Sequence, residues 1–260
     1  MVNKISRFGF KLEKGGVHTS RTMMLEDLHT LLSYVCNPGS TKTDYLRAIK
    51  EDNCLGKRSG RNRKLTAGHL ISLYSLDPSV TIFRSLLYFW NRDIEGQPLL
   101  ALMCAYARDP LLRLCTAFIL KFNKDEIVTR KALEEYIDSK DSGHFSMATL
   151  SSTAQNLNST WTKSGHLTGK AKKMRSRAKA TPGSVSYGLF LGYLMGFRGE
   201  ALFINDFALL LDCSREKAME YAQEASRRGW IVFKRVGNVI EVQFPNLLTV
   251  EEREWIRDQN

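Results

Sequence analysis

Residues 146–182 read SMATLSSTAQNLNSTWTKSGHLTGKAKKMRSRAKATP, and this stretch decides how the rest of the chain is interpreted. Its first half has apolar residues three and four positions apart, which predicts one buried stripe on a helix: Met147, Leu150, Ala154, Leu157 and Trp161. The other face is polar and uncharged, Gly165 ends the helix, and a basic tract follows. No Asp or Glu occurs between Ser142 and Gly199. This pattern is typical of the recognition helix and wing of a winged helix that binds nucleic acid.

The basic side chains of this stretch are the predicted phosphate contacts, because affinity for a duplex depends on cations that neutralise phosphates: Lys163, Lys170, Lys172, Lys173, Arg175, Arg177 and Lys179. Gln155, Asn156 and Ser159 are expected near base edges. Since the helix has amides but no arginine, we expect little sequence preference. The alternative that the sequence leaves open is a solvated helix beside a flexible basic loop.

The order of elements around this stretch is that of a helix-turn-helix, and it occurs twice. A short helix over 129–140 and a turn at 141–144 precede the stretch, so 123–182 is predicted to be a winged helix-turn-helix with a basic wing. Residues 183–245 repeat the order as a connecting helix and a second winged-helix unit that ends in a hairpin. The long helix of this second unit mixes acidic and basic residues. It is therefore as well suited to packing or partner binding as to DNA contact.

Capping residues predict where several helices begin. N-caps are expected at Thr129, Asn205 and Ser214, a capping box at Thr41–Asp44, and the opening of a helix at Ser146. A short helix is expected over Leu65–Tyr74. Within the apolar helix at Ser184–Phe197, Gly188, Gly192 and Gly196 are expected to allow close approach to another helix.

The rest of the chain is predicted to be helical. Residues 1–55 are interpreted as an N-terminal arm and helices, 56–122 as a helical bundle core, and 246–260 as a C-terminal helix. Helices in the bundle are expected to start at prolines, two of which follow an N-capping Asp: Asp77–Pro78, Gln97–Pro98 and Asp109–Pro110. The predicted fold class is mainly α, with an N-terminal helical bundle followed by winged-helix units with small β-hairpin wings.

A second basic tract, Gly56–Lys64, contains five cations and two glycines in nine residues. It is predicted to be a mobile loop suited to phosphate contacts, although a solvated linker explains it equally well. Its candidate DNA-binding residues are Lys57, Arg58, Arg61, Arg63 and Lys64.

The composition limits which partners, which compartment and which kinds of activity are expected for the chain. The chain has 260 residues and a net charge of +11, which points to a polyanionic partner, either nucleic acid or an anionic membrane surface. Its five cysteines are scattered without metal-ligand or disulfide spacing, so a reducing cytoplasm is expected and no metal or cofactor is predicted. The most apolar run, Val185–Phe197, is shorter than the roughly 20 residues that span a bilayer, so membrane insertion is not expected. Since no catalytic motif is present, we do not expect an enzyme.

Three segments resemble the BrxA family of bacteriophage exclusion (BREX) defence systems. They are the run from Tyr74-Ser-Leu-Asp-Pro to Trp90, the run PLLALMCAYARDPLLR at 98–113, and LNSTWTKSGHLTG at 157–169. The resemblance implies a cytoplasmic component of a phage-defence locus that binds double-stranded DNA through winged-helix parts. It also implies a helical region similar to RNA-binding antitermination factors of the NusB type, and other BREX components as candidate partners. It supplies no catalytic residues.

Two alternatives to DNA binding remain open. An RNA-binding module would use the Gly56–Lys64 tract beside the helical bundle. A protein-interaction scaffold would use the second winged-helix unit, and its best support is the mixed charge of the helix at Ser214–Arg228.

Overall fold

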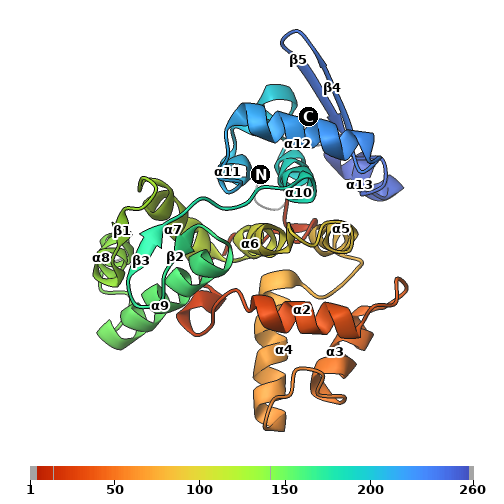
Figure 1. The fold of residues 1–260 in the computed structure, drawn as a ribbon. Helices are drawn as coiled ribbons and strands as arrows, with labels where there is room; N and C mark the ends of the chain where they lie inside the picture. The colour runs from red at the N-terminus through yellow and green to blue at the C-terminus, as the bar shows by residue number, and fades with distance from the viewer. Residues whose placement is uncertain (1–4, 14, 141, 258–260) are drawn as a thin grey trace.

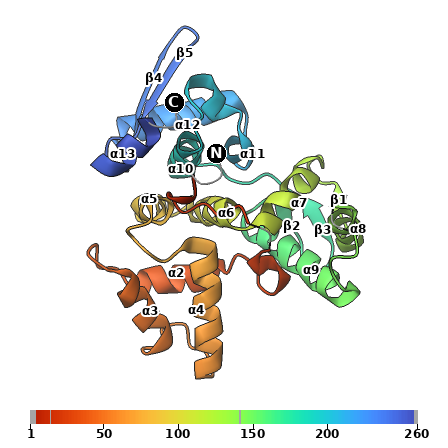
Figure 2. The same cartoon turned by 180° about the vertical axis from the view of Figure 1, so that it is seen from behind.

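The computed structural model describes residues 5–13, 15–140 and 142–257. The chain is mainly helical, with two small antiparallel sheets. Figure 1 shows two central helices, α5 (Thr81–Trp90) and α6 (Gln97–Arg108), with the other elements grouped around them in three lobes. The view from behind in Figure 2 shows the same three groups. Asp141 of the predicted turn and the chain ends at 1–4 and 258–260 lie outside the described residues.

The N-terminal lobe contains three helices, α2 (Leu25–Tyr34), α3 (Lys42–Lys50) and α4 (Gly60–Tyr74). α4 packs on both α3 and α6. The prediction of a mobile loop over Gly56–Lys64 is wrong for the second half of that tract. The Ser59 hydroxyl accepts a hydrogen bond from Asn62 N–H and caps the helix, so α4 begins at Gly60, five residues before the expected start.

The Asp-Pro pairs behave differently from each other. Asp109 is the N-cap of the helix that follows it, as predicted, since its carboxylate accepts hydrogen bonds from Leu111 and Leu112 N–H. Asp77 is not an N-cap. Its carboxylate accepts hydrogen bonds from the backbone N–H and the hydroxyl of Ser79, and this turn delays the start of α5 to Thr81.

The wing lobe lies at one end of the central helices and contains three helices and a three-stranded sheet (Figure 1). Its elements are, in chain order, α7 (Pro110–Leu120), β1 (Ile127–Val128), α8 (Arg130–Lys140), α9 (Met147–Lys163), β2 (Leu167–Thr168) and β3 (Lys173–Arg175). The strand order is β1-β3-β2, and both pairs are antiparallel. α9 packs on α8, which packs on α7. The wing is the hairpin formed by β2, β3 and the loop between them.

α9 is capped as expected, because Ser146 Oγ accepts a hydrogen bond from Thr149 N–H. Leu157 and Trp161 of the predicted stripe are completely buried, and so is Ala154. Met147 is 88% exposed, so its assignment to the stripe is wrong. The first turn of the helix is exposed, and the stripe begins with the half-buried Leu150.

The C-terminal lobe lies on the opposite side of α5 and α6 from the N-terminal lobe, and its hairpin projects away from the molecule in both ribbon views. Its elements are α10 (Pro182–Leu194), the 3-10 helix η2 (Gly199–Phe203), α11 (Asp206–Leu209), α12 (Arg215–Arg227), β4 (Val232–Val236), β5 (Val239–Gln243) and α13 (Val250–Arg257). β4 and β5 form the second sheet. α10 packs against α5, α6 and α12.

α10 is buried on nearly all sides, as its apolar composition indicates. The predicted close approach at its glycines is confirmed at Gly188 and Gly192. A Cβ at Gly188 would lie 3.1 Å from Met103 Sδ, and a Cβ at Gly192 would lie 2.6 Å from the Asn205 side-chain amide. Gly196 instead lies beyond the helix with φ near 97°, a turn conformation that favours glycine.

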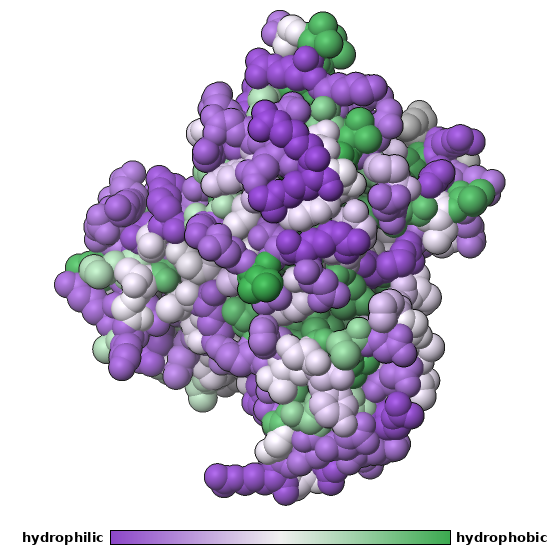
Figure 3. All heavy atoms as spheres, turned by 45° about the vertical axis from the view of Figure 1, so that its right-hand side comes forward, coloured by the Kyte–Doolittle hydropathy of each residue, from purple (hydrophilic) through white to green (hydrophobic). Residues whose placement is uncertain are grey.

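In the described part of the chain, no helix has both the length and the apolar character that crossing a membrane requires. On the face drawn in Figure 3, hydrophilic side chains cover most of the surface and hydrophobic ones form small groups.

Candidate nucleic-acid interface

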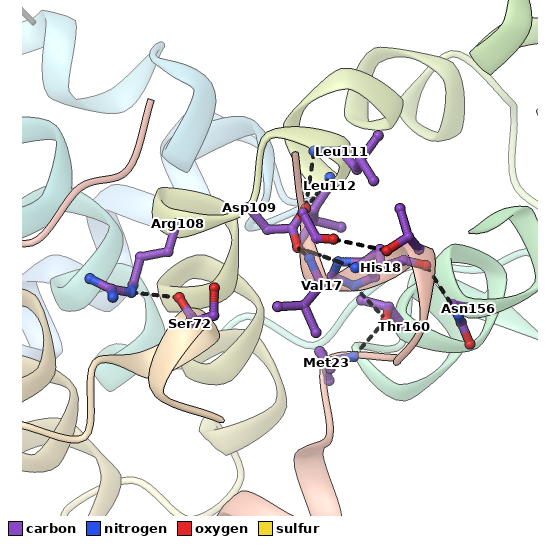
Figure 4. A network of polar contacts seen from close by, with 12 residues as sticks. Val17, His18, Met23, Ser72, Arg108, Asp109, Leu111, Leu112, Asn156 and Thr160 are labelled. Atoms are coloured by element: carbon purple, nitrogen blue, oxygen red, sulfur yellow. Dashed lines mark hydrogen bonds and ion pairs between the residues drawn. The ribbon is translucent and has the colours of Figure 1, made fainter. Parts of the chain in front are cut away.

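The polar face of α9 is divided into two stripes with different neighbours. One stripe lies against residues Val17–Met23, which we call the N-terminal segment. Asn156 Nδ2 donates a hydrogen bond to the His18 carbonyl (3.0 Å), and Ser152 Oγ donates one to the Thr19 carbonyl (3.3 Å). Thr160 Oγ1 accepts one from Met23 N–H (2.9 Å), as Figure 4 shows. This stripe therefore makes hydrogen bonds to another part of the protein.

The N-terminal segment is held in place by Asp109, at the start of α7 (Figure 4). The Asp109 carboxylate accepts a hydrogen bond from Val17 N–H (2.6 Å) and lies 3.0 Å from His18 Nδ1. Asp109 and His18 are both completely buried. Burial opposes ionisation of Asp109, but His18 and the backbone amides outweigh it and hold the pKa of the carboxyl below its ordinary value. Because this anchor keeps the segment on α9, Asn156 is engaged inside the protein and does not face a base edge.

The second stripe of α9 faces a cavity of about 1070 Å³, which we call the wing cavity. Gln155, Asn158 and Ser159 line it from α9, and Ile127 and Val128 line it from β1. Its other walls are the first residues of α8 and the wing: Thr129, Arg130, Lys131, Glu134, Lys170, Ala171, Lys172 and Lys173. Glu134 is the only acidic residue of this lining, and its carboxylate pairs with Arg130 (Nε–Oε1 3.1 Å). The cavity wall is therefore strongly positive.

Asn158 is a buried polar side chain of this lining with an unsatisfied acceptor. It is 5% exposed, and its Oδ1 has no hydrogen-bond partner. A buried amide left in this state costs on the order of 1–3 kcal/mol. The sequence does not reveal this, because Asn158 lies between the helix faces that the apolar spacing defines.

Acidic residues from other elements neutralise part of the predicted phosphate-binding tract. Lys163 pairs with Glu26 of α2, and Lys179 pairs with Glu95 of the α5–α6 loop (2.9 Å). Lys170 and Lys172 are exposed and have no ion-pair partner among the described residues. Lys173 Nζ donates a hydrogen bond to the Gly169 carbonyl (2.6 Å), and burial lowers its pKa. The free positive charge of the tract is thus concentrated on the wing.

Arg175, at the end of β3, is a buried structural group. It is 1% exposed and forms a bidentate ion pair with Asp212, at distances of 2.8 and 2.7 Å. Asp212 also accepts hydrogen bonds from Arg177 (2.7 Å) and from Ala178 N–H (3.0 Å). Burial opposes ionisation of Asp212, but these donors outweigh it and hold its pKa below the ordinary value. The pair joins the wing to the C-terminal lobe, which leaves Arg175 inaccessible to a phosphate.

The second basic tract lies in the N-terminal lobe, which Figure 1 places apart from the wing. Lys57 pairs with Asp27 (2.7 Å), and Arg63 Nη1 donates a hydrogen bond to the Lys50 carbonyl (2.9 Å). Arg58, Arg61 and Lys64 are exposed at and before the first turn of α4. The structure therefore does not bring the two tracts together.

Sequence reasoning missed the contribution of α8 to the wing cavity. Thr129 Oγ1 accepts a hydrogen bond from Ala132 N–H, which caps α8 and confirms the predicted N-cap. The first helical residues, Arg130 and Lys131, then lie beside the cavity. Arg130 and Lys131 directly follow β1, which pairs with β3, and this position is the signal that they lie near the wing. The sequence does not show it, because a strand of only two residues has no recognisable pattern.

Within residues 5–13, 15–140 and 142–257, no group of three or more His, Cys, Asp or Glu side chains is arranged to hold a metal ion. No protein-family model matches the chain, and a search of curated proteins gives no match either.

His166, at the base of the wing, makes the stability of this region dependent on pH. Its ring is buried between Ser164 Oγ (2.9 Å) and the Leu210 carbonyl (3.1 Å), and burial lowers its pKa to about 4. An unfolded histidine has a pKa near 6.5, so the unfolded state takes up the proton first as the pH falls. The contribution to stability is complete above about pH 6.5 and is lost between about pH 6.5 and pH 4.

We expect the wild type to lose about 2 kcal/mol of unfolding free energy through His166 between pH 7 and pH 5. Urea unfolding at the two pH values measures the loss. His166→Gln, which does not titrate, should show a correspondingly smaller difference between them. An equal pH dependence in wild type and variant would contradict the assignment to His166.

Proposed function

We propose that the protein is a non-enzymatic component of a phage-defence locus similar to BREX, and that it binds double-stranded DNA in the cytoplasm. Contact is mainly to phosphates and comes from the wing, with little sequence preference. The bundle around α5 and α6 corresponds to the region that the BrxA resemblance compares with NusB-type factors.

The order of elements in the wing lobe supports this proposal. A helix, a short strand, two helices and a hairpin follow one another from α7 to β3, which is the order expected of a winged helix with α9 as recognition helix. The first strand joins the hairpin in one antiparallel sheet. The C-terminal lobe repeats the helices and the hairpin from α10 to β5, with a sheet of only two strands.

The observation that carries the proposal is the free positive charge on the wing. Lys170, Lys172 and Lys173 line the wing cavity together with Arg130 and Lys131 of α8. Cations gathered at one site release the counterions of a phosphate backbone and so drive binding. On α9, Gln155 is exposed and Ser159 half-buried beside this charge, and they are the candidates for base contact. Arg175 and Asn156 are left out because their side chains are engaged internally.

Replacing Lys170, Lys172 and Lys173 together by Ala tests the proposal. We expect the affinity for a duplex to fall by about tenfold or more at moderate salt. The slope of log affinity against log salt should become shallower by up to about 3, because about 0.9 of a counterion is released per phosphate neutralised. Fluorescence anisotropy of a labelled duplex over a range of salt concentrations measures both quantities.

The matched control removes the same charge from exposed positions that lie outside the wing lobe and have no ion-pair partner among the described residues. It combines Lys50→Gln, Arg227→Gln and Lys234→Gln. We expect this variant to bind within about twofold of the wild type. Equal losses in the two variants would show that only the net charge matters, and unchanged binding in the wing variant would refute the proposal.

RNA binding through Arg58, Arg61 and Lys64 is the second candidate, favoured by their exposure together around the start of α4. Competition between single-stranded RNA and duplex DNA distinguishes RNA binding from DNA binding, since an RNA-binding module would prefer RNA. Its affinity for RNA would fall when Arg58, Arg61 and Lys64 are replaced, and not when the wing lysines are replaced. A scaffold role through the C-terminal lobe predicts instead that protein partners remain bound after nuclease treatment.

A further inference from the structure

The wing cavity has the size and shape of a ligand site. At about 1070 Å³ it is as large as the sites that proteins use for small molecules, and it is a half-open cleft between α8, α9 and the wing. A groove that only follows a DNA backbone needs no such depth. Ile127 and Val128 give the cavity an apolar wall, and the polar groups are gathered on the other sides.

One end of the cavity suits a phosphate group. Thr129 Oγ1 accepts a hydrogen bond from the Ala132 N–H. The N–H groups of Arg130 and Lys131 are the first two of α8, and they have no acceptor within that eleven-residue helix. The positive end of the helix dipole adds to this attraction for an anion. Lys170 and Lys172 approach the same space from the wing, and Lys131 has only a long contact with Glu135 (3.9 Å).

The opposite wall suits a nucleobase. Asn158 is 95% buried and lines the cavity, and its side-chain Oδ1 has no hydrogen-bond partner among the described residues. Gln155 and Ser159 place further hydrogen-bonding groups on the same face of α9. On β1, Ile127 is 47% exposed and gives the cavity an aliphatic surface that can lie against the face of a base.

We propose that the wing cavity binds a single nucleotide, with its phosphate at the start of α8 beside Lys170 and Lys172 and its base hydrogen-bonded to the side-chain amide of Asn158. The nucleotide is either free in solution or an unpaired nucleotide of a strand. This proposal rests on the proposed function, because the same lysines would contact the duplex. It differs in that binding of a nucleotide also requires the side chain of Asn158. Phosphate contacts of a duplex do not need that side chain.

The test titrates the full chain with three small probes and two duplexes, by calorimetry and by anisotropy. The small probes are inorganic phosphate, adenosine 5′-monophosphate and cytidine 5′-monophosphate. The duplexes are a fully paired one and the same one with a single unpaired nucleotide. We expect at least one nucleotide to bind about tenfold more tightly than inorganic phosphate.

The decisive variant is Asn158→Leu. Because Oδ1 has no partner, an aliphatic side chain of similar size should leave the melting temperature unchanged or raise it, which shows that the variant folds. Nucleotide affinity should fall about tenfold, while affinity for inorganic phosphate and for the paired duplex stays within about twofold. If Asn158→Leu melts well below the wild type, Ser159→Ala replaces it in the same measurements.

The two sources of the nucleotide give different results. A free nucleotide is the ligand if the two duplexes bind equally tightly and Asn158→Leu weakens the binding of neither duplex. A strand nucleotide is the ligand if the duplex with the unpaired position binds more tightly and loses this advantage in Asn158→Leu. Nucleotides that bind no better than phosphate, or no response to Asn158→Leu and Ser159→Ala, overturn the nucleotide site while the duplex measurements still decide the proposed function. Failure of every probe, including the paired duplex, overturns both.

Discussion

Asp212→Ala is expected to lower the free energy of unfolding by about 3–5 kcal/mol, because it leaves the charge of Arg175 buried without its ion-pair partner. Both side chains are at most 2% exposed, and the wild-type pair is bidentate. The guanidinium cannot reach water without moving β3, to which it belongs. Urea unfolding at neutral pH, followed by circular dichroism, measures the loss.

Two further variants separate a buried pair from an ordinary ion pair. Arg175→Met combined with Asp212→Leu removes both charges and should recover most of the lost stability, since an apolar pair of similar volume often replaces a buried ion pair without cost. Glu95→Ala breaks the exposed Lys179–Glu95 pair, which also joins the chain after the wing to another element, and should cost less than about 1 kcal/mol. If the double variant is as unstable as Asp212→Ala, the unpaired charge is not the cause.

Local patterns were sufficient to predict most of the helices. The capping residues Ser146, Asn205 and Ser214 accept the expected backbone hydrogen bonds, and the Thr41–Asp44 capping box is present. These signals succeed because a cap and its helix lie within four residues of each other. Where the prediction was wrong, as at Asp77, the Asp-Pro pair formed a turn of its own before the helix began.

The charge of the candidate site could not be predicted in the same way. The stretch from Ser142 to Gly199 contains no acidic residue, so every cation in it appeared free. Folding brings Glu26, Glu95 and Asp212 to it from distant positions. Such pairs depend on tertiary contacts between lobes, and no local spacing encodes them. The three wing lysines Lys170, Lys172 and Lys173 are what remains for a ligand.

The N-terminal segment had a similar effect on α9. The sequence pattern of α9 predicted one continuous polar face. In the structure, Ser152, Asn156 and Thr160 on that face form hydrogen bonds to residues Val17–Met23. The face that remains, with Gln155, Asn158 and Ser159, is narrower and lines the wing cavity. This arrangement positions α9 from one side and leaves the other side for binding. The position of the candidate site therefore depends on the contact that anchors the segment.

Asp109→Ala tests that anchor, and we expect it to lower the free energy of unfolding by about 3–7 kcal/mol. Loss of the N-cap of α7 accounts for about 1 kcal/mol. Val17 N–H and the His18 ring then remain buried without their acceptor, which costs on the order of 1–3 kcal/mol for each group. Hydrogen exchange should show a second effect, faster exchange of the Val17 and Met23 amides, because the segment is no longer held against α9.

Asp77→Ala is the matched control, because Asp77 also precedes a proline but holds only the local turn at Ser79 and a long ion pair with Lys42 (3.7 Å). We expect it to cost less than about 1 kcal/mol and to leave exchange at Val17 unchanged. Asp109→Asn should lower the free energy of unfolding by an amount between those of Asp77→Ala and Asp109→Ala. The amide oxygen of the new side chain can still accept hydrogen bonds from Leu111 and Leu112 N–H, but the substitution removes the negative charge beside His18. Equal losses for Asp77→Ala and Asp109→Ala would show that Asp109 acts only within its own turn. In that case the contacts from Ser152, Asn156 and Thr160 would be sufficient to hold the N-terminal segment on α9.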